Sequence, residues 1–313
     1  MLRPSRILAA GGIAAVALAF APFWASTASA DFIYGIDDSN NIHEVNTSTQ
    51  SSVEVYTNGT IPSGFSNAFA YDTARDQFFF IDSGNNLEFW SRSGNPTTLV
   101  TAADLDLTSN PQPQNAAYYN DAYWFFYENT NTLVQVPFTY VAGLPTVGSP
   151  ATVNGFLLSQ AGGGTGPSTW TNTFGDIAIN ANTGILYGAT QSGVLFSVDL
   201  NGGNPSTATS IASGLPSLQL SFSSDYSTLY GQAFGGGQWY EVSTTTGATT
   251  PINGFITQFS GTDGLRDLGG AATTSVVPEI DPASFGSVLV LLLGALGLVE
   301  RRTLRRLSPA GAV

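Results

Sequence analysis

The sequence predicts an all-β protein, a β-propeller of about five blades, from three observations. A pattern of short strands recurs along the chain, and repeats of about 40–50 residues with four strands each are typical of propeller blades. The region 31–276 has no convincing helical period. The first unit of this region lacks an opening strand, and one strand without a unit of its own stands at the end. A closed ring accounts for both ends together.

Four copies of the repeat are recognisable. They begin at Asn67, Asn115, Gly175 and Leu218, with spacings of 48, 60 and 43 residues. Each has a short small or apolar strand, a turn, an aromatic-rich strand, a second turn and an alternating strand. A loop rich in Gly, Pro and Ser accounts for the longest spacing. The segment 143–170 leaves room for a sixth, degenerate blade, but five blades are favoured.

The two ends of the region 31–276 are expected to complete one blade. The segment FIYGIDDSNNIHEVNTSTQSSVEVYT, from Phe32, matches the second, third and fourth strands of a unit. The segment LRDLGGAATT, from Leu265, matches the missing first strand. Pairing between them would close the ring; an irregular β-sandwich or a β-solenoid is the alternative. Strand aromatics are expected to pack between blades, among them Phe78, Trp124, Phe125, Tyr187 and Tyr230.

The charge distribution excludes one class of partner. Between residues 31 and 276 there are three arginines, no lysine and nineteen acidic residues, a formal charge of −16. Such a surface lacks the basic footprint that nucleic-acid binding requires, so no nucleic acid is expected as partner. It would attract cations such as Ca²⁺. The chain has no cysteine, which excludes disulfides, thiolate metal sites and a cysteine nucleophile.

The N-terminus is typical of a secretory signal peptide. Two arginines precede an apolar run from Ile7 to about Phe23, and small residues follow. Ala28 and Ala30 fit the small-x-small cleavage pattern, which makes Asp31 the expected mature start. Residues 1–30 are therefore predicted to be removed; a retained membrane anchor is the alternative.

The C-terminus contains a candidate membrane span. Residues 283–299 are seventeen positions without a charge, near the shortest length that crosses a bilayer. Arginines follow at positions 301, 302, 305 and 306. Because basic residues beside a span stay on the cytoplasmic side, the region before it is expected to face outward. The simplest interpretation is a lasting C-terminal anchor.

A second interpretation comes from the order VPE, short apolar segment, ERR at the end of the chain. This order resembles the PEP-CTERM sorting signal, in a planctomycete-type form that reads VPEIDP, over residues 277–306, with 307–313 as a tail. Ile280 replaces the second proline of the tripeptide, so the match is a variant. The resemblance implies that an exosortase-type membrane transpeptidase cuts near Pro278 and exports or attaches the rest. The residues that carry it are Val277, Pro278, Glu279, Pro282, Arg301 and Arg302.

The reactive side chains of the region 31–276 are mainly carboxylates. The single histidine, His43, lies on an expected strand, where a structural role is the simpler interpretation. Asp72 and Asp225 are expected to cap turns after the first strand of a unit. Asp176 and Asp267 stand where a first strand begins, the position from which side chains would reach the central axis. Further carboxylates lie on later strands, at Glu44, Glu88 and Glu241.

Two acidic turns are weak candidates for Ca²⁺ binding. DDSNN, with Asp37 and Asp38, and DSGNN, with Asp82, offer carboxylate and amide oxygens. Neither has EF-hand spacing, and both are simpler as hairpin turns. No other cofactor is expected.

Together these features predict a secreted propeller, sorted to the cell envelope or extracellular matrix and held in the membrane until it is processed. Its expected role is non-catalytic, structural, adhesive or ligand-binding, with polysaccharide as a candidate partner, and no catalytic residue is assigned. The alternative is a carbohydrate-active enzyme of the glycoside hydrolase kind. That alternative requires at least two carboxylates gathered at one face of the axis.

Overall fold

The computed structural model describes residues 31–56, 67–92, 95–108, 113–148, 151–160, 175–234, 237–254 and 264–272. These ranges contain 23 strands and no α-helix. The expected signal peptide, the sorting residues and the candidate span 283–299 lie outside them. Within these ranges no helix is long and apolar enough to cross a bilayer.

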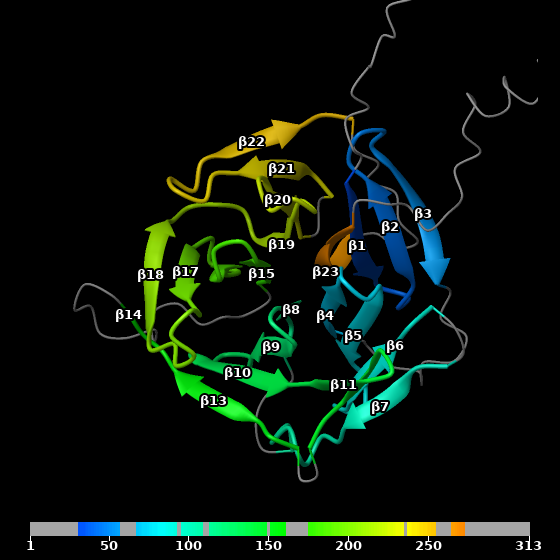
Figure 1. Cartoon of the computed structure of the whole chain (residues 1–313). Helices are drawn as coiled ribbons and strands as arrows, with labels where there is room; N and C mark the ends of the chain where they lie inside the picture. Colours follow the sequence, from blue (N-terminus) through cyan, green and yellow to red (C-terminus); the bar gives the residue numbers. More distant parts are fainter. Residues whose placement is uncertain are drawn as a thin grey trace, which may run out of the picture.

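Five sheets stand around a central axis as a five-bladed propeller (Figure 1). From the axis outward, blade 1 contains β23 (Leu265–Ala272), β1 (Phe32–Asp37), β2 (Ile42–Asn46) and β3 (Ser51–Tyr56). Blade 2 contains β4 (Asn67–Asp72), β5 (Gln77–Ile81), β6 (Leu87–Trp90) and β7 (Thr97–Val100). Blade 3 contains β8 (Ala116–Tyr118), β9 (Ala122–Phe126), β10 (Thr132–Pro137) and β13 (Asn154–Leu157). Blade 4 contains β15 (Ile177–Asn180), β16 (Ile185–Ala189), β17 (Leu195–Asp199), β18 (Thr207–Ala212) and β14 (Ser159–Gln160). Blade 5 contains β19 (Leu218–Phe222), β20 (Leu229–Ala233), β21 (Trp239–Val242) and β22 (Thr249–Ile252).

The predicted blade count is confirmed, and the sandwich and solenoid alternatives are wrong. The segment that left room for a sixth blade supplies other elements where the structure describes it. β11 (Thr139–Val141) and β12 (Leu144–Thr146) form a separate hairpin, and β13 completes blade 3. β14 adds a fifth strand to blade 4 by pairing in parallel with β18.

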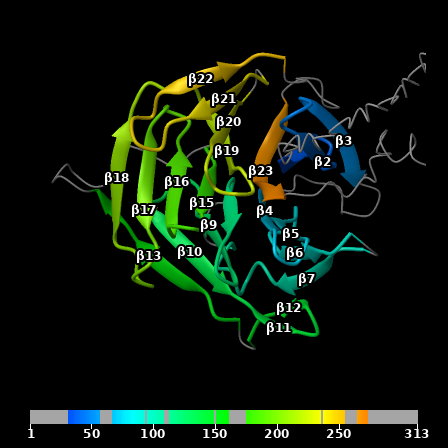
Figure 2. The same ribbon diagram turned by 45° about the horizontal axis from the view of Figure 1, so that its top comes forward.

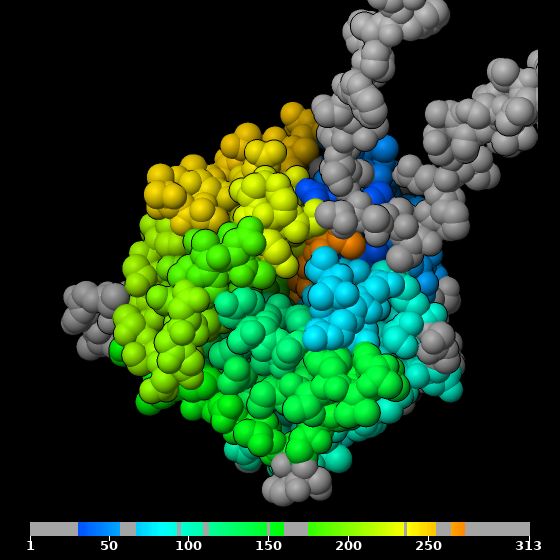
Figure 3. Space-filling view, viewed as in Figure 1, coloured from blue at the N-terminus to red at the C-terminus, as the bar shows by residue number. Residues whose placement is uncertain are grey.

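The ring closes as the sequence predicts. β23 pairs with β1 in antiparallel register from Phe32 opposite Ala272, so the two ends of the region share blade 1. Figure 3 shows β23, in orange, at the centre of one face between the cyan and yellow sectors. A Cβ on Gly269 would lie 2.5 Å from the Phe69 ring, so a residue without a side chain lets β23 approach β4.

The hydrophobic core is divided among the spaces between the blades, whose arrangement Figure 2 shows in a tilted view. Five clusters of buried side chains are found among the described residues, and each joins two neighbouring blades. Phe78, Trp124 and Phe125 are buried as expected, while Tyr187 and Tyr230 are half-buried. Burying one such ring stabilises the fold by about 2–3 kcal/mol. Because these side chains pack between adjacent blades, the repeated aromatic residues stabilise the contacts around the whole ring.

The five innermost strands run in the same direction along the axis. We call the face where they begin the start face and the face where they end the end face. Each innermost strand pairs on one side only, so its other backbone edge is turned toward the axis. Such unpaired edges need other hydrogen-bond partners when they are buried.

Candidate functional site

Every innermost strand carries one buried polar side chain at or near its beginning. We call this set the axial ring; its members are Asn67, Asn115, Asp176, Gln219 and Asp267, all at most 5% exposed. Each comes from a different blade. The repeat therefore places two carboxyl groups and three amides around the axis near the start face.

Three members of the axial ring bind the following blade. Asp176 of blade 4 accepts a hydrogen bond from the Leu220 backbone N–H of blade 5 (2.8 Å). Asp267 of blade 1 accepts one from the Phe69 N–H of blade 2 (2.6 Å). The Asn67 amide of blade 2 donates to the side chain of Gln114 at blade 3 (2.7 Å). All three bonds tie successive blades together, and the two to the aspartates also satisfy backbone N–H groups on the open inner edges.

Asp176 and Asp267, which sequence position singled out, are brought together at the axis. Asp176 also accepts from the Ile177 N–H (2.6 Å) and the Leu268 N–H (3.4 Å). Protonated Asp267 donates a hydrogen bond to the Asp176 carboxylate. Burial raises the pKa of Asp176 to about 7, and burial together with the charge of Asp176 raises the pKa of Asp267 well above its usual range. The pair therefore keeps at least one proton at neutral pH, the one on Asp267.

The environment of this pair suits a structural role. Both side chains have 0% of their surface exposed, and neither lines the pocket that lies further along the axis. The Asp176 carboxylate is already engaged by three backbone N–H groups and by Asp267. A sugar ring has no access to either carboxyl group in this structure. The two carboxylates that a glycosidase needs are thus gathered but sealed from substrate.

The other carboxylates that the sequence singled out serve turns and strands of blades 1, 2 and 5. Asp72 accepts from the Ala74 N–H (3.0 Å), and Asp225 accepts from the Ser227 N–H (2.9 Å). Hydrogen bonds from Ser223 and Ser227 lower the pKa of Asp225. The three glutamates are placed differently: Glu44 accepts from the Tyr34 hydroxyl, Glu88 from Thr98, and Glu241 lines a shallow groove on blade 5.

In the candidate Ca²⁺ turns, the carboxylates bind neighbouring groups of the chain itself. Asp37 accepts from the Asn41 N–H (2.9 Å) and contacts the His43 ring (Nε2 to Oδ2, 2.8 Å). Asp82 accepts from the Asn86 N–H (2.8 Å). Asp38 pairs with Arg266, with 2.6 Å between Oδ1 and Nε. Across the described parts of the chain, no group of three His, Cys, Asp or Glu side chains is placed to hold a metal ion.

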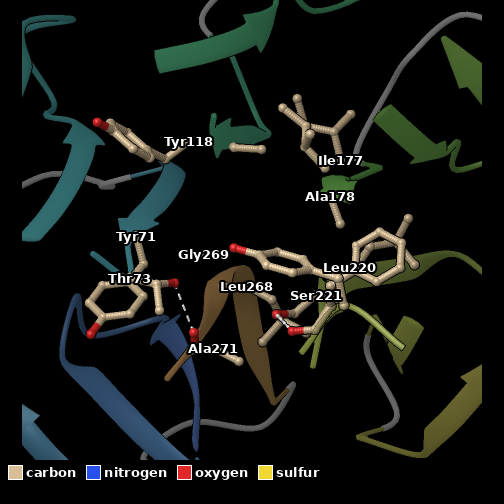
Figure 4. Close-up of a pocket in the computed structure, with 15 residues that line it drawn as sticks. Tyr71, Thr73, Tyr118, Ile177, Ala178, Leu220, Ser221, Leu268, Gly269 and Ala271 are labelled. Carbon is tan, nitrogen blue, oxygen red and sulfur yellow. Dashed lines mark hydrogen bonds between the residues drawn. The ribbon is translucent and has the colours of Figure 1, made fainter. Parts of the chain in front are cut away.

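A small pocket with a volume of about 30 Å³ lies on the axis toward the end face (Figure 4). Small and apolar residues of the innermost strands form its walls, including Ala117, Ala178, Leu220, Leu268 and Gly269. Among the described residues that line it, none has a charged side chain. The backbone edges of the innermost strands are turned toward it, so its surface combines apolar groups with neutral donors and acceptors.

Residues with hydroxyl groups line the mouth of this pocket, but Tyr71 and Tyr118 turn their hydroxyl groups away from it (Figure 4). Thr73 donates to the Ala271 carbonyl oxygen (2.9 Å), the dashed line in Figure 4. The Tyr118 hydroxyl is 2.8 Å from that of Tyr140, and the Tyr71 hydroxyl donates to Asp76 (2.9 Å). Burial raises the pKa values of Tyr71 and Tyr118, so both phenols stay neutral. These bonds hold the tyrosines of the rim in place.

Sequence reasoning did not identify this pocket. Its available signal was the run of small residues on the innermost strands, such as the alanine in NAAYY and the glycines in LRDLGGAA. Small residues on a strand are equally consistent with close packing, so the pattern alone does not distinguish a pocket. The expected cleavage and sorting residues are not tested by the geometry; of them only Asp31 is described, and its carbonyl oxygen accepts from the Thr47 N–H.

No protein-family model matches the chain, and no curated protein matches it in sequence. Three solved structures illustrate what its fold is similar to. A nidogen/laminin complex aligns at 12% identity over 78% of this chain and 97% of that chain, with a TM-score of 0.43. An auxiliary nutrient binding protein from Bacteroides thetaiotaomicron aligns at 12% identity over 77% and 60%, with a TM-score of 0.47. The β-propeller domain of Myceliophteria thermophila Cps50 (Swd1) aligns at 12% identity over 71% and 66%, with a TM-score of 0.41.

Proposed function

We propose that this chain is an exported propeller, associated with the cell surface or extracellular matrix, that binds polysaccharide without hydrolysing it. The observation that carries the proposal is the uncharged axial pocket, from which the buried carboxyl pair is sealed off. The pocket is much smaller than the clefts of about 300–1,000 Å³ that enclose a small ligand, so a polysaccharide would lie across its mouth rather than inside it. A neutral sugar residue suits this mouth, because it offers hydroxyl groups to the backbone edges and C–H groups to the apolar side chains.

Filling the pocket tests this function. Ala178 lines the pocket and also packs in the core between blades 4 and 5, so Ala178→Leu would fill part of the pocket, and its urea unfolding midpoint is measured to check that the fold accepts the larger side chain. Ala181→Leu is the matched control, because Ala181 is exposed on the turn after β15. Binding of the full chain to a panel of neutral polysaccharides would weaken about tenfold or more in the first variant and stay unchanged in the control. Equal binding by both variants and the parent chain would refute the pocket as the binding site.

Hydrolysis is the competing outcome. If the buried carboxyl pair were catalytic, the chain would release reducing ends from one of these polysaccharides, and Asp176→Asn would abolish the release. We expect no release from the parent chain. Appearance of such an activity would replace the binding proposal with the glycosidase alternative.

Export and processing by an exosortase-type transpeptidase are the second part of the proposal. They are supported by the VPE, apolar and ERR segments of the C-terminus. Mass spectrometry of the exported protein is expected to find a C-terminus near Pro278. An intact end that contains Arg302 would refute processing and favour a lasting anchor.

A further inference from the structure

The described chain enters and leaves the ring on the same face. Ala272 is the last residue of β23, the innermost strand of blade 1, and it pairs with Phe32 at the beginning of β1. β23 ends at the end face, close to the axis, where its residue Ala271 lines the axial pocket. Any tether that follows Ala272 therefore starts near the centre of the end face.

The length of this tether is set by the sequence. Eleven residue steps separate Ala272 from Ala283, where the uncharged segment 283–299 begins. Fully extended, they span at most about 40 Å, and six steps to Pro278 span at most about 20 Å. A domain of about 250 residues is about 45 Å across. To bring the start face against the membrane, the tether would have to cross half that width and then the height of a blade, about 20 Å. That path is about as long as the whole tether before processing, and it is longer than the tether that would remain after cleavage near Pro278.

We propose that the tether holds the propeller with its end face toward the membrane that anchors it and its start face toward the surroundings. This orientation rests on the export and anchoring part of the proposed function. It also specifies the source of the ligand, because the axial pocket lies at the end face. The polysaccharide would then belong to the surface that carries the protein, and the start face would remain open to the exterior.

The absence of cysteine from the chain gives a direct test with one thiol at a time. Ala181→Cys places a thiol on the turn between β15 and β16, at the end face. Ser192→Cys places one on the turn between β16 and β17 of the same blade, at the start face. Both positions are exposed, and both substitutions nearly preserve side-chain size. The full chain of each variant is inserted into phosphatidylcholine vesicles, and labelling by a polymer-linked maleimide is compared with labelling in detergent.

We expect the vesicle to slow labelling of Ala181→Cys several-fold and to leave Ser192→Cys unchanged. Equal rates for the two variants in vesicles, or slower labelling at Ser192→Cys, would overturn the orientation while leaving the anchor intact. A replacement of Leu291, Leu292 and Leu293 by Asp provides the control for anchoring, since it should release the protein from the vesicles. If the unmodified tail also fails to hold the protein on vesicles, the anchoring proposal fails, and the orientation fails with it. Polysaccharide binding by the full chain in detergent is measured separately, so failure of the pocket remains distinguishable.

Discussion

Replacing Asp267 by Asn should stabilise the propeller at neutral pH, although it removes a buried side chain from the axis. In the native chain Asp267 accepts from the Phe69 N–H through Oδ2 and gives a proton to Asp176. An asparagine reproduces both interactions, because its oxygen accepts from Phe69 and its amide donates to Asp176. The substitution therefore keeps the hydrogen bonds of the pair and removes the titration of Asp267.

The magnitude follows from proton linkage. In the unfolded chain Asp267 ionises near pH 4, whereas the folded chain keeps its proton because burial and Asp176 raise its pKa. The unfolded state thus binds fewer protons, and stability falls by up to about 1.4 kcal/mol per pH unit above pH 4 until the folded pKa is reached. Between about pH 4 and pH 7 the native chain would lose up to about 4 kcal/mol through this group. Asp267→Asn should lack that loss.

Asp176→Asn is the matched comparison. Asp176 accepts backbone N–H bonds on both oxygens, from Ile177 on one and from Leu220 and Leu268 on the other. Asparagine has one acceptor oxygen, so at least one buried N–H loses its partner, at a cost of about 1–3 kcal/mol. Because burial also raises the pKa of Asp176 to about 7, this variant too escapes a loss of stability with rising pH, and the N–H without a partner should leave it about 1–3 kcal/mol less stable than Asp267→Asn.

Urea unfolding followed by tryptophan fluorescence, between about pH 5 and pH 8, measures these differences. Subtracting the native curve removes the contributions of all other groups. A difference for Asp267→Asn that grows with pH supports the shared proton. A difference that is flat with pH, or an Asp267→Asn variant no more stable than Asp176→Asn, would refute the reasoning.

Three further predictions concern packing, an ion pair and closure. A Cβ on Gly175 would lie 1.7 Å from a backbone oxygen of β16, so Gly175→Ala should lower the free energy of unfolding by about 3 kcal/mol or more. Gly155→Ala is the control: the nearest atom to its Cβ lies at 3.6 Å, so the free energy of unfolding should change by at most about 0.5 kcal/mol in the same assay. Arg75→Ala should lower the free energy of unfolding by about 1–3 kcal/mol, because it leaves the buried carboxylate of Asp72 without its ion pair and removes the guanidinium that lies 3.6 Å from the centre of the Tyr140 ring. A melting temperature equal to that of the native chain would contradict this prediction. A chain that ends at Gly264 lacks β23 and should lose its cooperative thermal transition, since β23 closes blade 1; a transition as sharp as that of a chain ending at Val277 would show that closure contributes little.

Much of the fold was predictable because the blade is a local repeat. The Asn67, Asn115, Gly175 and Leu218 units each contain their own strands and turns, so their number and order follow from short-range patterns. The closing strand from Leu265 was predictable for a related reason. Pairing the single strand at one end with the incomplete unit at the other is the simplest way to complete a fifth blade, and the register between β23 and β1 confirms this pairing.

The candidate site was predictable only in part. Sequence position placed Asp176 and Asp267 at the beginning of innermost strands, but their shared hydrogen bond depends on how far each side chain reaches across the axis. The roles of Asp72 and Asp225 in turns follow from neighbouring residues, and the structure has them in those roles. The axial pocket could not be predicted, because its walls come from all five blades and its volume is what their side chains leave unfilled.

The sequence by itself determined the strands, their turns, the number of blades and the partners that close the ring, because each depends on contacts between neighbours in the chain or in the repeat. Tertiary structure alone decided which polar groups meet at the axis, that the two carboxyl groups are sealed, and that an uncharged pocket opens beside them. The physical reason is that burial at the axis is shared among five sheets. No single segment of the chain specifies how much space or water remains there.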